Sequence, residues 1–190
     1  MRRIVKTLAL LVIVFATSIS PASANHSCFG VSGSHGTSGA DTPTLTGSAD
    51  TYSGLGGSDT IDGLGGADRL CGNDDNDTIG GDAGNDSLDG GAGVDEIHGD
   101  NNEDLIHGGD AGDELLGEAD ADEVQGQEGS DDAHGGENDD EVHGNNGNDD
   151  HVHGNAGDDV LFGGAGSSDI CEGGAGIDIF DASCEIVIPN

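Results

Sequence analysis

One short pattern of apolar and polar positions repeats along the chain from Gly54 onward. Each unit opens with glycine, most units carry aspartate at the sixth place, and one apolar residue stands at the eighth place between mostly polar neighbours. The units are nine residues long, except for two units of ten residues that begin at Gly144 and Gly163. The fourteen opening glycines are Gly54, Gly63, Gly72, Gly81, Gly90, Gly99, Gly108, Gly117, Gly126, Gly135, Gly144, Gly154, Gly163 and Gly173.

Each unit predicts a glycine-rich turn followed by a short strand. Glycine provides the backbone freedom that a tight turn needs. Alternate side chains of a strand point to opposite faces, so only the eighth-place residue can face inward. Because one unit buries a single side chain, it cannot be stable alone and must stack on copies of itself. The inward residues expected in the first ten units are Ile61, Leu70, Ile79, Leu88, Ile97, Ile106, Leu115, Val124, Ala133 and Val142.

The units resemble the RTX, or haemolysin-type, calcium-binding nonapeptide repeat G-G-x-G-x-D-x-U-x. The segments GGAGVDEIH (90–98) and GGAGIDIFD (173–181) match this pattern at every specified place. The resemblance covers residues 54–181 and implies an all-β fold, a calcium-bound parallel β-roll in which two successive units form one coil. About fourteen units would then make about seven coils. We expect the repeats alone, with no accompanying enzyme or toxin domain.

The remaining chain divides into four short regions. Residues 1–24 have a basic start, an apolar run and an A-x-A site, which predicts a cleaved signal peptide, with an uncleaved membrane anchor as the alternative. Residues 25–44 are expected to be a flexible Gly/Ser/Thr leader. Residues 45–53 are interpreted as a degenerate capping unit, although chance agreement with the register is an alternative. The roll would span 54–181, and 182–190 would form a C-terminal tail.

Acidic residues dominate the charge of the exported chain. After removal of the signal peptide, Arg69 alone stands against 39 acidic residues, which leaves a formal charge of −38. Repulsion at this charge excludes nucleic acid and anionic lipid as partners. No later segment is apolar enough to span a membrane, and no protein or surface partner can be named. With 37 glycines and 3% aromatic residues, the chain must have its carboxylates neutralised before it can fold.

The aspartates of the units are the candidate metal ligands. Calcium takes six to eight oxygen ligands, from carboxylates and backbone carbonyls. The resemblance implies ions between the turns of adjacent coils, so Asp95 would share one ion with Asp77 and another with Asp113. A solvated acidic face is the alternative. The candidate ligands for multiple Ca²⁺ are Asp59, Asp68, Asp77, Asp86, Asp95, Asp104, Asp113, Asp122, Asp131, Asp140, Asp150, Asp159 and Asp178.

Some units depart from the repeat. In the ten-residue unit at Gly144, placing the extra residue in the turn makes Asp150 the ligand and Val152 the inward residue. In the unit at Gly163, Ser168 takes the sixth place with Asp169 beside it, and the insertion cannot be placed. Turns that lack glycine at the fourth place are expected to bind differently or weakly; they carry Asp75, Asn102, Ala111, Asp120 and Asn138 there.

Cysteine and histidine suggest two further features. Four cysteines in an oxidising compartment favour disulfides, with three possible pairings. In a roll of this kind we favour Cys28–Cys71 and Cys171–Cys184, although free thiols also fit. Histidines at the ninth place could serve a second metal, and His134 and His153 would be close enough to share Zn²⁺ or Ni²⁺. We favour solvent-facing strand residues for these histidines: His98, His107, His134, His143 and His153.

The chain carries no recognisable catalytic motif. After the signal peptide it has no lysine, no G-x-S-x-G and no H-E-x-x-H. Its carboxylates form an array in which no single cleft stands out. We therefore expect no enzyme but a secreted, extracellular calcium-binding repeat protein that folds on binding its ions. An extracellular surface or matrix protein that uses the roll as an adhesive or spacer is the alternative.

Overall fold

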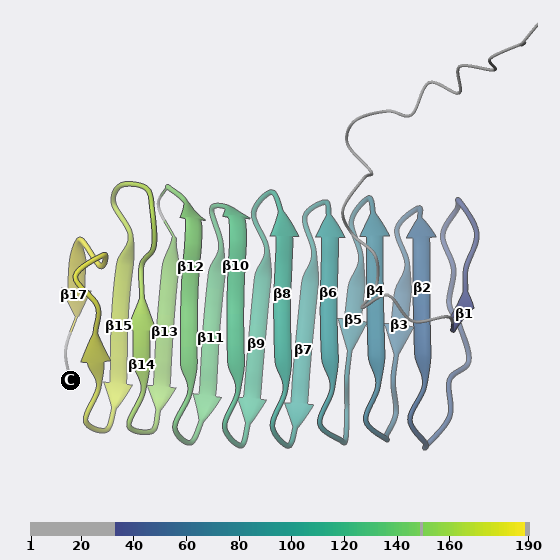
Figure 1. Cartoon of the computed structure of the whole chain (residues 1–190), viewed down its shortest axis with the longest axis horizontal. Coiled ribbons are helices and arrows are strands. Elements are labelled where there is room, and N and C mark those ends of the chain that lie inside the picture. The colour runs from purple at the N-terminus through teal and green to yellow at the C-terminus, as the bar shows by residue number, and fades with distance from the viewer. Residues whose placement is uncertain (1–32, 149, 189–190) are drawn as a thin grey trace, which may run out of the picture.

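The structure is a computed structural model that describes residues 33–148 and 150–188. In this part of the chain it contains seventeen strands and no helix, and therefore no helix that could cross a membrane. The strands form two parallel sheets that face each other along an elongated roll (Figure 1). The chain passes from one sheet to the other at most turns, so from β2 onward the even-numbered and odd-numbered strands build different sheets, and β1 joins the even-numbered strands.

The two sheets have nine and eight strands. The nine-stranded sheet contains, in spatial order, β1 (Ser34–His35), β2 (Thr51–Gly56), β4 (Arg69–Asp74), β6 (Ser87–Ala92), β8 (Leu105–Asp110), β10 (Glu123–Gly129), β12 (Glu141–Gly147), β14 (Val160–Phe162) and β16 (Ile179–Phe180). The eight-stranded sheet contains β17 (Ile186–Ile188), β15 (Ile170–Ala175), β13 (His151–Ala156), β11 (Asp132–Glu137), β9 (Glu114–Ala119), β7 (Glu96–Asn101), β5 (Thr78–Gly80) and β3 (Thr60–Asp62).

The register of the sheets follows from the length of two units. Leu88 on β6 pairs with Ile106 on β8, eighteen residues later. Past the first ten-residue unit the step becomes nineteen, and Ala133 on β11 pairs with Val152 on β13. Equivalent places of every second unit therefore stack in straight rows along the roll.

These observations confirm the predicted all-β parallel roll but correct its count. The solenoid has about nine turns. The predicted count of about fourteen units is therefore too high, and the predicted count of about seven coils is too low. The extra coils lie at the ends, where β1 pairs with β2 and β17 pairs with β15. Their sequences lack the regular repeat, and a count of glycine-led units therefore misses them.

The core is one layer of side chains between the two sheets. Each inward residue alternates with outward polar residues along its strand, as the period of two predicts. All ten inward residues predicted from the first ten units are buried, and Val152, Leu161 and Cys171 continue the rows. Leu45 and Tyr52, from the segment interpreted as a cap, extend the same cluster at the N-terminal end. One small apolar side chain per unit is little burial for nine ordered residues, so the core alone does not account for a stable fold.

The turns use left-handed backbone at the second place of every unit and at the fourth place of most units. The second place has a positive φ whether it is glycine, as in Gly91 (φ 106°), or another residue, as in Leu55 (φ 80°). The fourth place keeps a positive φ in the turns that lack glycine there, including Ala111 at 88°. A left-handed conformation costs a non-glycine residue about 1–2 kcal/mol, less for asparagine. The turn geometry is therefore retained at some cost in the degenerate units.

The N-terminal part of the described chain differs from the expected flexible leader. Residues 36–44 form one more turn of the stack, because β1 pairs with β2 and the Asp41 carbonyl accepts a hydrogen bond from Thr60 N–H at 3.0 Å. The predicted signal peptide (1–24) and Cys28 lie outside the described residues.

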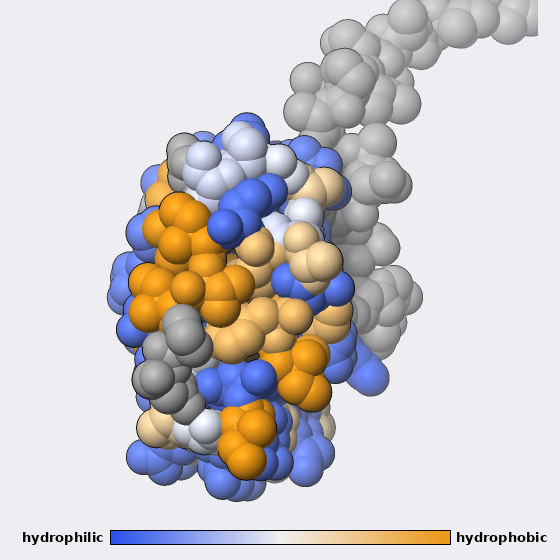
Figure 2. All heavy atoms as spheres, turned by 90° about the vertical axis from the view of Figure 1, so that its left-hand side faces the viewer, coloured by the Kyte–Doolittle hydropathy of each residue, from blue (hydrophilic) through white to orange (hydrophobic). Residues whose placement is uncertain are grey.

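The C-terminal end is closed by a disulfide. Cys171 on β15 is bonded to Cys184, which confirms this predicted pair. Cys71 is also disulfide-bonded. Exposed apolar side chains gather at this end of the roll (Figure 2); they include Ile177, Ile179, Ile186, Val187 and Ile188.

Candidate metal centre

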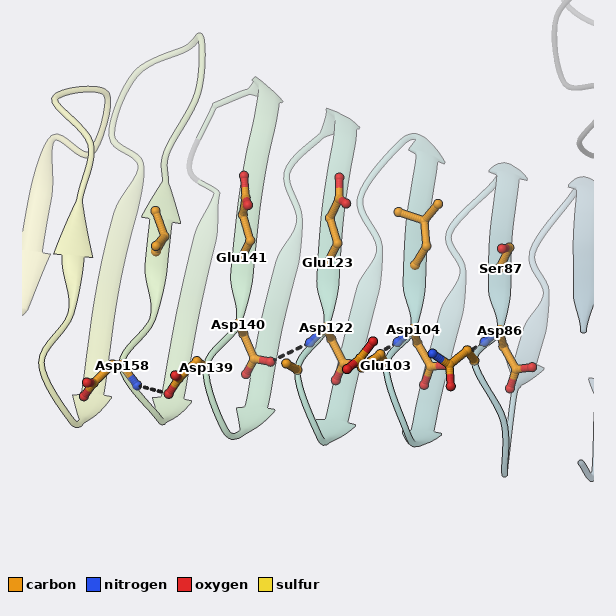
Figure 3. A pocket seen from close by; sticks show the side chains of 14 residues that line it. Asp86, Ser87, Glu103, Asp104, Asp122, Glu123, Asp139, Asp140, Glu141 and Asp158 are labelled. Carbon is orange, nitrogen blue, oxygen red and sulfur yellow. Dashed lines mark hydrogen bonds between the residues drawn. The ribbon is translucent and has the colours of Figure 1, made fainter. Parts of the chain in front are cut away.

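Aspartates line the inside of the turns in two rows, one along each edge of the roll. Each aspartate ends its turn immediately before the next strand, two residues before an inward apolar residue, and its side chain is buried. The rows stack because the strands pair in register. Figure 3 shows one row, in which Asp86, Asp104, Asp122 and Asp140 follow one another. The buried members are Asp59, Asp68, Asp77, Asp86, Asp95, Asp104, Asp113, Asp122, Asp131, Asp140, Asp150, Asp159 and Asp169, each at most 5% exposed.

One oxygen of each carboxylate, Oδ1, is held by the preceding coil. The backbone N–H of Asp77 donates to Asp95 Oδ1 at 2.8 Å, and the N–H of Asp95 donates to Asp113 Oδ1 at 2.9 Å. The same bond continues through both rows, up to Asp159 N–H and Asp178 Oδ1 at 3.2 Å. These contacts fix every carboxylate in position. They link aspartates of adjacent coils, such as Asp77, Asp95 and Asp113, which are the aspartates expected to share ions.

The other oxygen, Oδ2, is buried without a hydrogen-bond partner in eleven of these aspartates. A buried polar atom without a partner costs about 1–3 kcal/mol, and more when it is charged. Protein interiors compensate a buried charge with an opposite charge or a metal ion. The arrangement therefore fits a hard cation with oxygen ligands. The eleven residues are Asp59, Asp68, Asp77, Asp86, Asp95, Asp104, Asp113, Asp122, Asp131, Asp140 and Asp159.

The opening glycine of each unit makes room for this oxygen. A Cβ atom at Gly63 would lie 2.7 Å from Asp68 Oδ2 and 2.7 Å from the Gly81 carbonyl oxygen. At Gly81 the corresponding distances to Asp86 Oδ2 and to the Gly99 carbonyl oxygen are 2.6 and 2.9 Å. The requirement for glycine at these positions is steric, because neither Gly63 nor Gly81 has a positive φ that would itself favour glycine. The glycine at the first place and the aspartate at the sixth place of each unit are therefore in direct contact, and each limits which residue fits at the other place.

Burial makes the charged form of these carboxylates unfavourable. Removal from water is the largest cause of each raised pKa, nearby carboxylates add to it, and the backbone hydrogen bond at Oδ1 acts in the opposite direction. The pKa rises to about 8 for Asp104 and Asp113, to about 7 for Asp77, Asp122 and Asp140, and to about 6 for Asp86, Asp95 and Asp131. At neutral pH, binding of protons or cations to these carboxylates therefore stabilises the folded state.

More acidic side chains surround the rows on the outside. An open groove of about 590 Å³ runs along the row of Figure 3, and Glu103, Asp139 and Asp158 lie at it beside the buried aspartates. A second groove, of about 410 Å³, follows Asp77 and Asp95 on the other edge. Both edges therefore attract cations from solution toward the inner oxygens.

Twelve of the thirteen predicted ligands lie in the buried rows. Asp150 occupies its row, so the extra residue of its unit lies in the turn as predicted. Asp178 is half-buried near the end of the roll, where it still accepts the bond from Asp159.

Sequence reasoning missed Asp169. Asp169 is fully buried in its row, whereas Ser168 lies in the turn with a φ of 74°. Counting backward from the strand would have found it, because Asp169 stands two residues before the inward Cys171. Glu185 ends this row, since its Oε2 accepts the Asp169 N–H at 2.9 Å.

Comparison with known proteins gives one match. The family model described as RTX calcium-binding nonapeptide repeat (4 copies) matches residues 45–79, 80–115, 116–150, 134–170 and 149–180, which together span most of the chain. No curated protein matches the chain, and no solved structure does. The matched residues contain both rows of buried aspartates.

Proposed function

Because this chain belongs to the RTX calcium-binding nonapeptide repeat family, whose repeats bind Ca²⁺, we propose that it is a secreted protein that folds as it binds several calcium ions between its stacked turns. The observation that carries this proposal is the set of eleven buried Oδ2 atoms without a hydrogen-bond partner. In the calcium-loaded protein, each such oxygen would contact an ion instead.

The proposed ligands are the thirteen predicted aspartates together with Asp169. Within a row, carboxylates one coil apart would share an ion, as Asp77 and Asp95 would on one edge and Asp104 and Asp122 on the other. Calcium, when bound, would supply the positive charge that offsets the burial of these carboxylates. The chain's own residues supply the rest: Oδ1 is fixed by a backbone N–H, and the opening glycine leaves space for Oδ2.

Calcium binding of this kind is coupled to folding. The rows exist only when the coils are stacked, so the free energy of binding adds to the free energy of folding. Extracellular calcium modules commonly have dissociation constants of about 10⁻⁴ to 10⁻³ M. We therefore expect a loosely ordered chain where calcium is scarce and a rigid roll outside the cell. The N-terminal segment and the Cys171–Cys184 disulfide support an extracellular location.

We propose no enzymatic activity. Acidic side chains repeat along both edges with similar surroundings, so no single pair is set apart for acid–base chemistry. The folded, ion-loaded roll would be the functional product.

Far-UV circular dichroism during a calcium titration tests the proposal. The chain lacking residues 1–24 should gain β signal cooperatively between about 0.1 and 1 mM Ca²⁺. Magnesium should fail to reproduce the change, because it demands near-octahedral geometry and gives up its water reluctantly. A chain that is fully folded in chelator at neutral pH, or that does not respond to calcium, would contradict the proposal.

A further inference from the structure

A second cluster of metal-ligating side chains lies away from the calcium rows, on the outward face of the eight-stranded sheet. It consists of Asp132 and His134 on β11 and His153 on β13. One ligand atom from each residue lies within 4.8 Å of the others. The strand register brings the histidines together, since His134 pairs with His153.

The side chains of this cluster already converge on one point. Asp132 Oδ1 lies 3.0 Å from His134 Nε2 and 3.5 Å from His153 Nε2. The two imidazole rings are stacked in parallel, with centroids 4.4 Å apart and an interplanar angle of 5°. Both rings therefore turn the same nitrogen toward the same carboxylate.

The surroundings prepare His153 as a ligand. Its other nitrogen, Nδ1, lies 3.6 Å from Glu172 Oε2 on the neighbouring strand β15. Metal-bound histidines usually donate their second nitrogen to a carboxylate or carbonyl, and Glu172 stands at ion-pair distance on that side of His153. Burial lowers the pKa of His153, with the charge of His134 as the next cause. The neutral imidazole that a metal needs is thereby favoured.

We propose that Asp132, His134 and His153 form a binding site for one transition-metal ion, of the class of Zn²⁺, in addition to the calcium rows. Imidazole nitrogen suits Zn²⁺, Cu²⁺ and Ni²⁺, whereas calcium prefers oxygen, so the two sets of sites select different ions. Three protein ligands leave one position of a tetrahedral ion open. His151 lies close by, with its ring centroid 6.2 Å from that of His153.

The other sheet contains a natural control for this site. His143 on β12 contacts Glu141 Oε1 through Nε2 at 2.9 Å, which repeats the carboxylate–x–histidine spacing of Asp132 and His134. The ring of His143 stacks in parallel on Phe162, with centroids 4.2 Å apart. Phe162 thus occupies the place that His153 has in the cluster, but it offers no nitrogen. The cluster therefore has a second imidazole, that of His153, where the site around His143 has the phenyl ring of Phe162. The proposal requires this second imidazole.

The test is a Zn²⁺ titration by calorimetry of the full chain in saturating calcium, repeated with Cu²⁺ and read by electron paramagnetic resonance. We expect one tight site per chain and coupling of the bound copper to two nitrogens. His153→Phe keeps the stacking but removes a ligand, and should weaken Zn²⁺ binding at least tenfold, because loss of an outer-shell partner alone costs about 10–100-fold. His143→Ala should leave the affinity unchanged.

A gain-of-site variant completes the test. Phe162→His places a second imidazole beside His143 and should raise the Zn²⁺ stoichiometry from one to two. The proposal is overturned if His153→Phe binds like the parent chain, if both histidine variants weaken binding equally, or if copper couples to one nitrogen or none. Circular dichroism of the same samples reports folding, so a failure of calcium to fold the chain is seen separately. A chain without β structure and without a Zn²⁺ site would also overturn the proposal, because only the strand register brings these residues together.

Discussion

The first two turns of the roll and the turns that follow them share one architecture but treat the aspartate differently. In the first turns, Asp41 Oδ2 accepts hydrogen bonds from Thr37 N–H and Oγ1 at 2.6 and 3.0 Å, and Asp50 Oδ2 accepts from Thr46 N–H and Oγ1, both at 2.8 Å. In eleven of the later turns, Oδ2 is buried without a hydrogen-bond partner.

The residue at the second place of the turn makes this difference. Threonine stands there in the first turns, without a positive φ, and its hydroxyl and N–H reach the carboxylate. In the later turns the second place has a positive φ, which a β-branched residue avoids, and no hydroxyl is present. The same turn can therefore neutralise its aspartate with protein donors or leave it for an ion. We therefore expect these first two turns, residues 36–53 and called the cap below, to fold without cations, and the rows to depend on them.

The largest effect should come from protons acting in place of calcium. The pKa is raised from 3.8 to between about 6 and about 8 in eight aspartates of the rows. The folded state therefore binds protons more tightly than the unfolded state, so this contribution to stability is fully present below about pH 4 and is lost as pH rises through 6 to 8. In calcium-depleted buffer, the chain should gain β signal by circular dichroism between pH 8 and pH 4.5.

The matching experiment in saturating calcium should show the opposite trend. Protons then compete with bound ions, so acidification should reduce the apparent stability. Equal pH profiles with and without calcium would mean that the row carboxylates are solvated.

Glycine substitutions should sharpen the comparison next. A Cβ atom at Gly108 would lie 2.5 Å from Asp113 Oδ2 and 2.8 Å from the Gly126 carbonyl, whereas one at Gly47 meets no atom within 4 Å. Gly108→Ala should lower the free energy of unfolding in calcium by about 3 kcal/mol, in the upper range for overpacking, because backbone must move. Gly47→Ala, in the cap, should change it by less than about 0.5 kcal/mol. Urea denaturation of both variants measures the difference, and similar values would contradict the assigned role of the opening glycine.

These two regions also show how far the sequence predicts the structure. Where an aliphatic residue marks the eighth place, as in Ile97, the inward rows and the aspartate rows follow from the period alone. The turn of residues 36–44 was missed because its eighth place is Pro43, which gives no strand signal. Asp169 was missed because an inserted residue can lie on either side of the ligand. Which carboxylates already have donors depends on backbone φ, and the letters of the repeat do not report that angle.

The effect of an aspartate-to-asparagine substitution on stability should be opposite in sign with and without calcium. Asp104→Asn removes a buried charge from the row. In chelator at pH 8 it should therefore stabilise the chain by about 1–3 kcal/mol, the cost of a buried polar atom without a partner. In calcium it should destabilise the chain and raise the calcium midpoint, because a ligand oxygen is lost. Asp50→Asn, in the cap, should show no such reversal. The β signal of both variants in chelator and their denaturation in calcium decide this, and a loss in both conditions for Asp104→Asn would contradict the ion-site role of the row.

The smallest effect should come from the cap. Thr46→Val keeps the shape of the side chain and the backbone N–H bond but removes the 2.8 Å hydroxyl bond to Asp50 Oδ2. A hydrogen bond to a charged group contributes about 1.5–3 kcal/mol when buried, and this exposed one should contribute nearer 1 kcal/mol. Because Asp50 then resembles a row aspartate with a donor missing, the loss should be larger in chelator than in calcium. Thr44→Val, which alters an exposed threonine two residues earlier, is the matched control. A loss that is the same in both buffers would mean that the hydroxyl stabilises the turn without standing in for an ion.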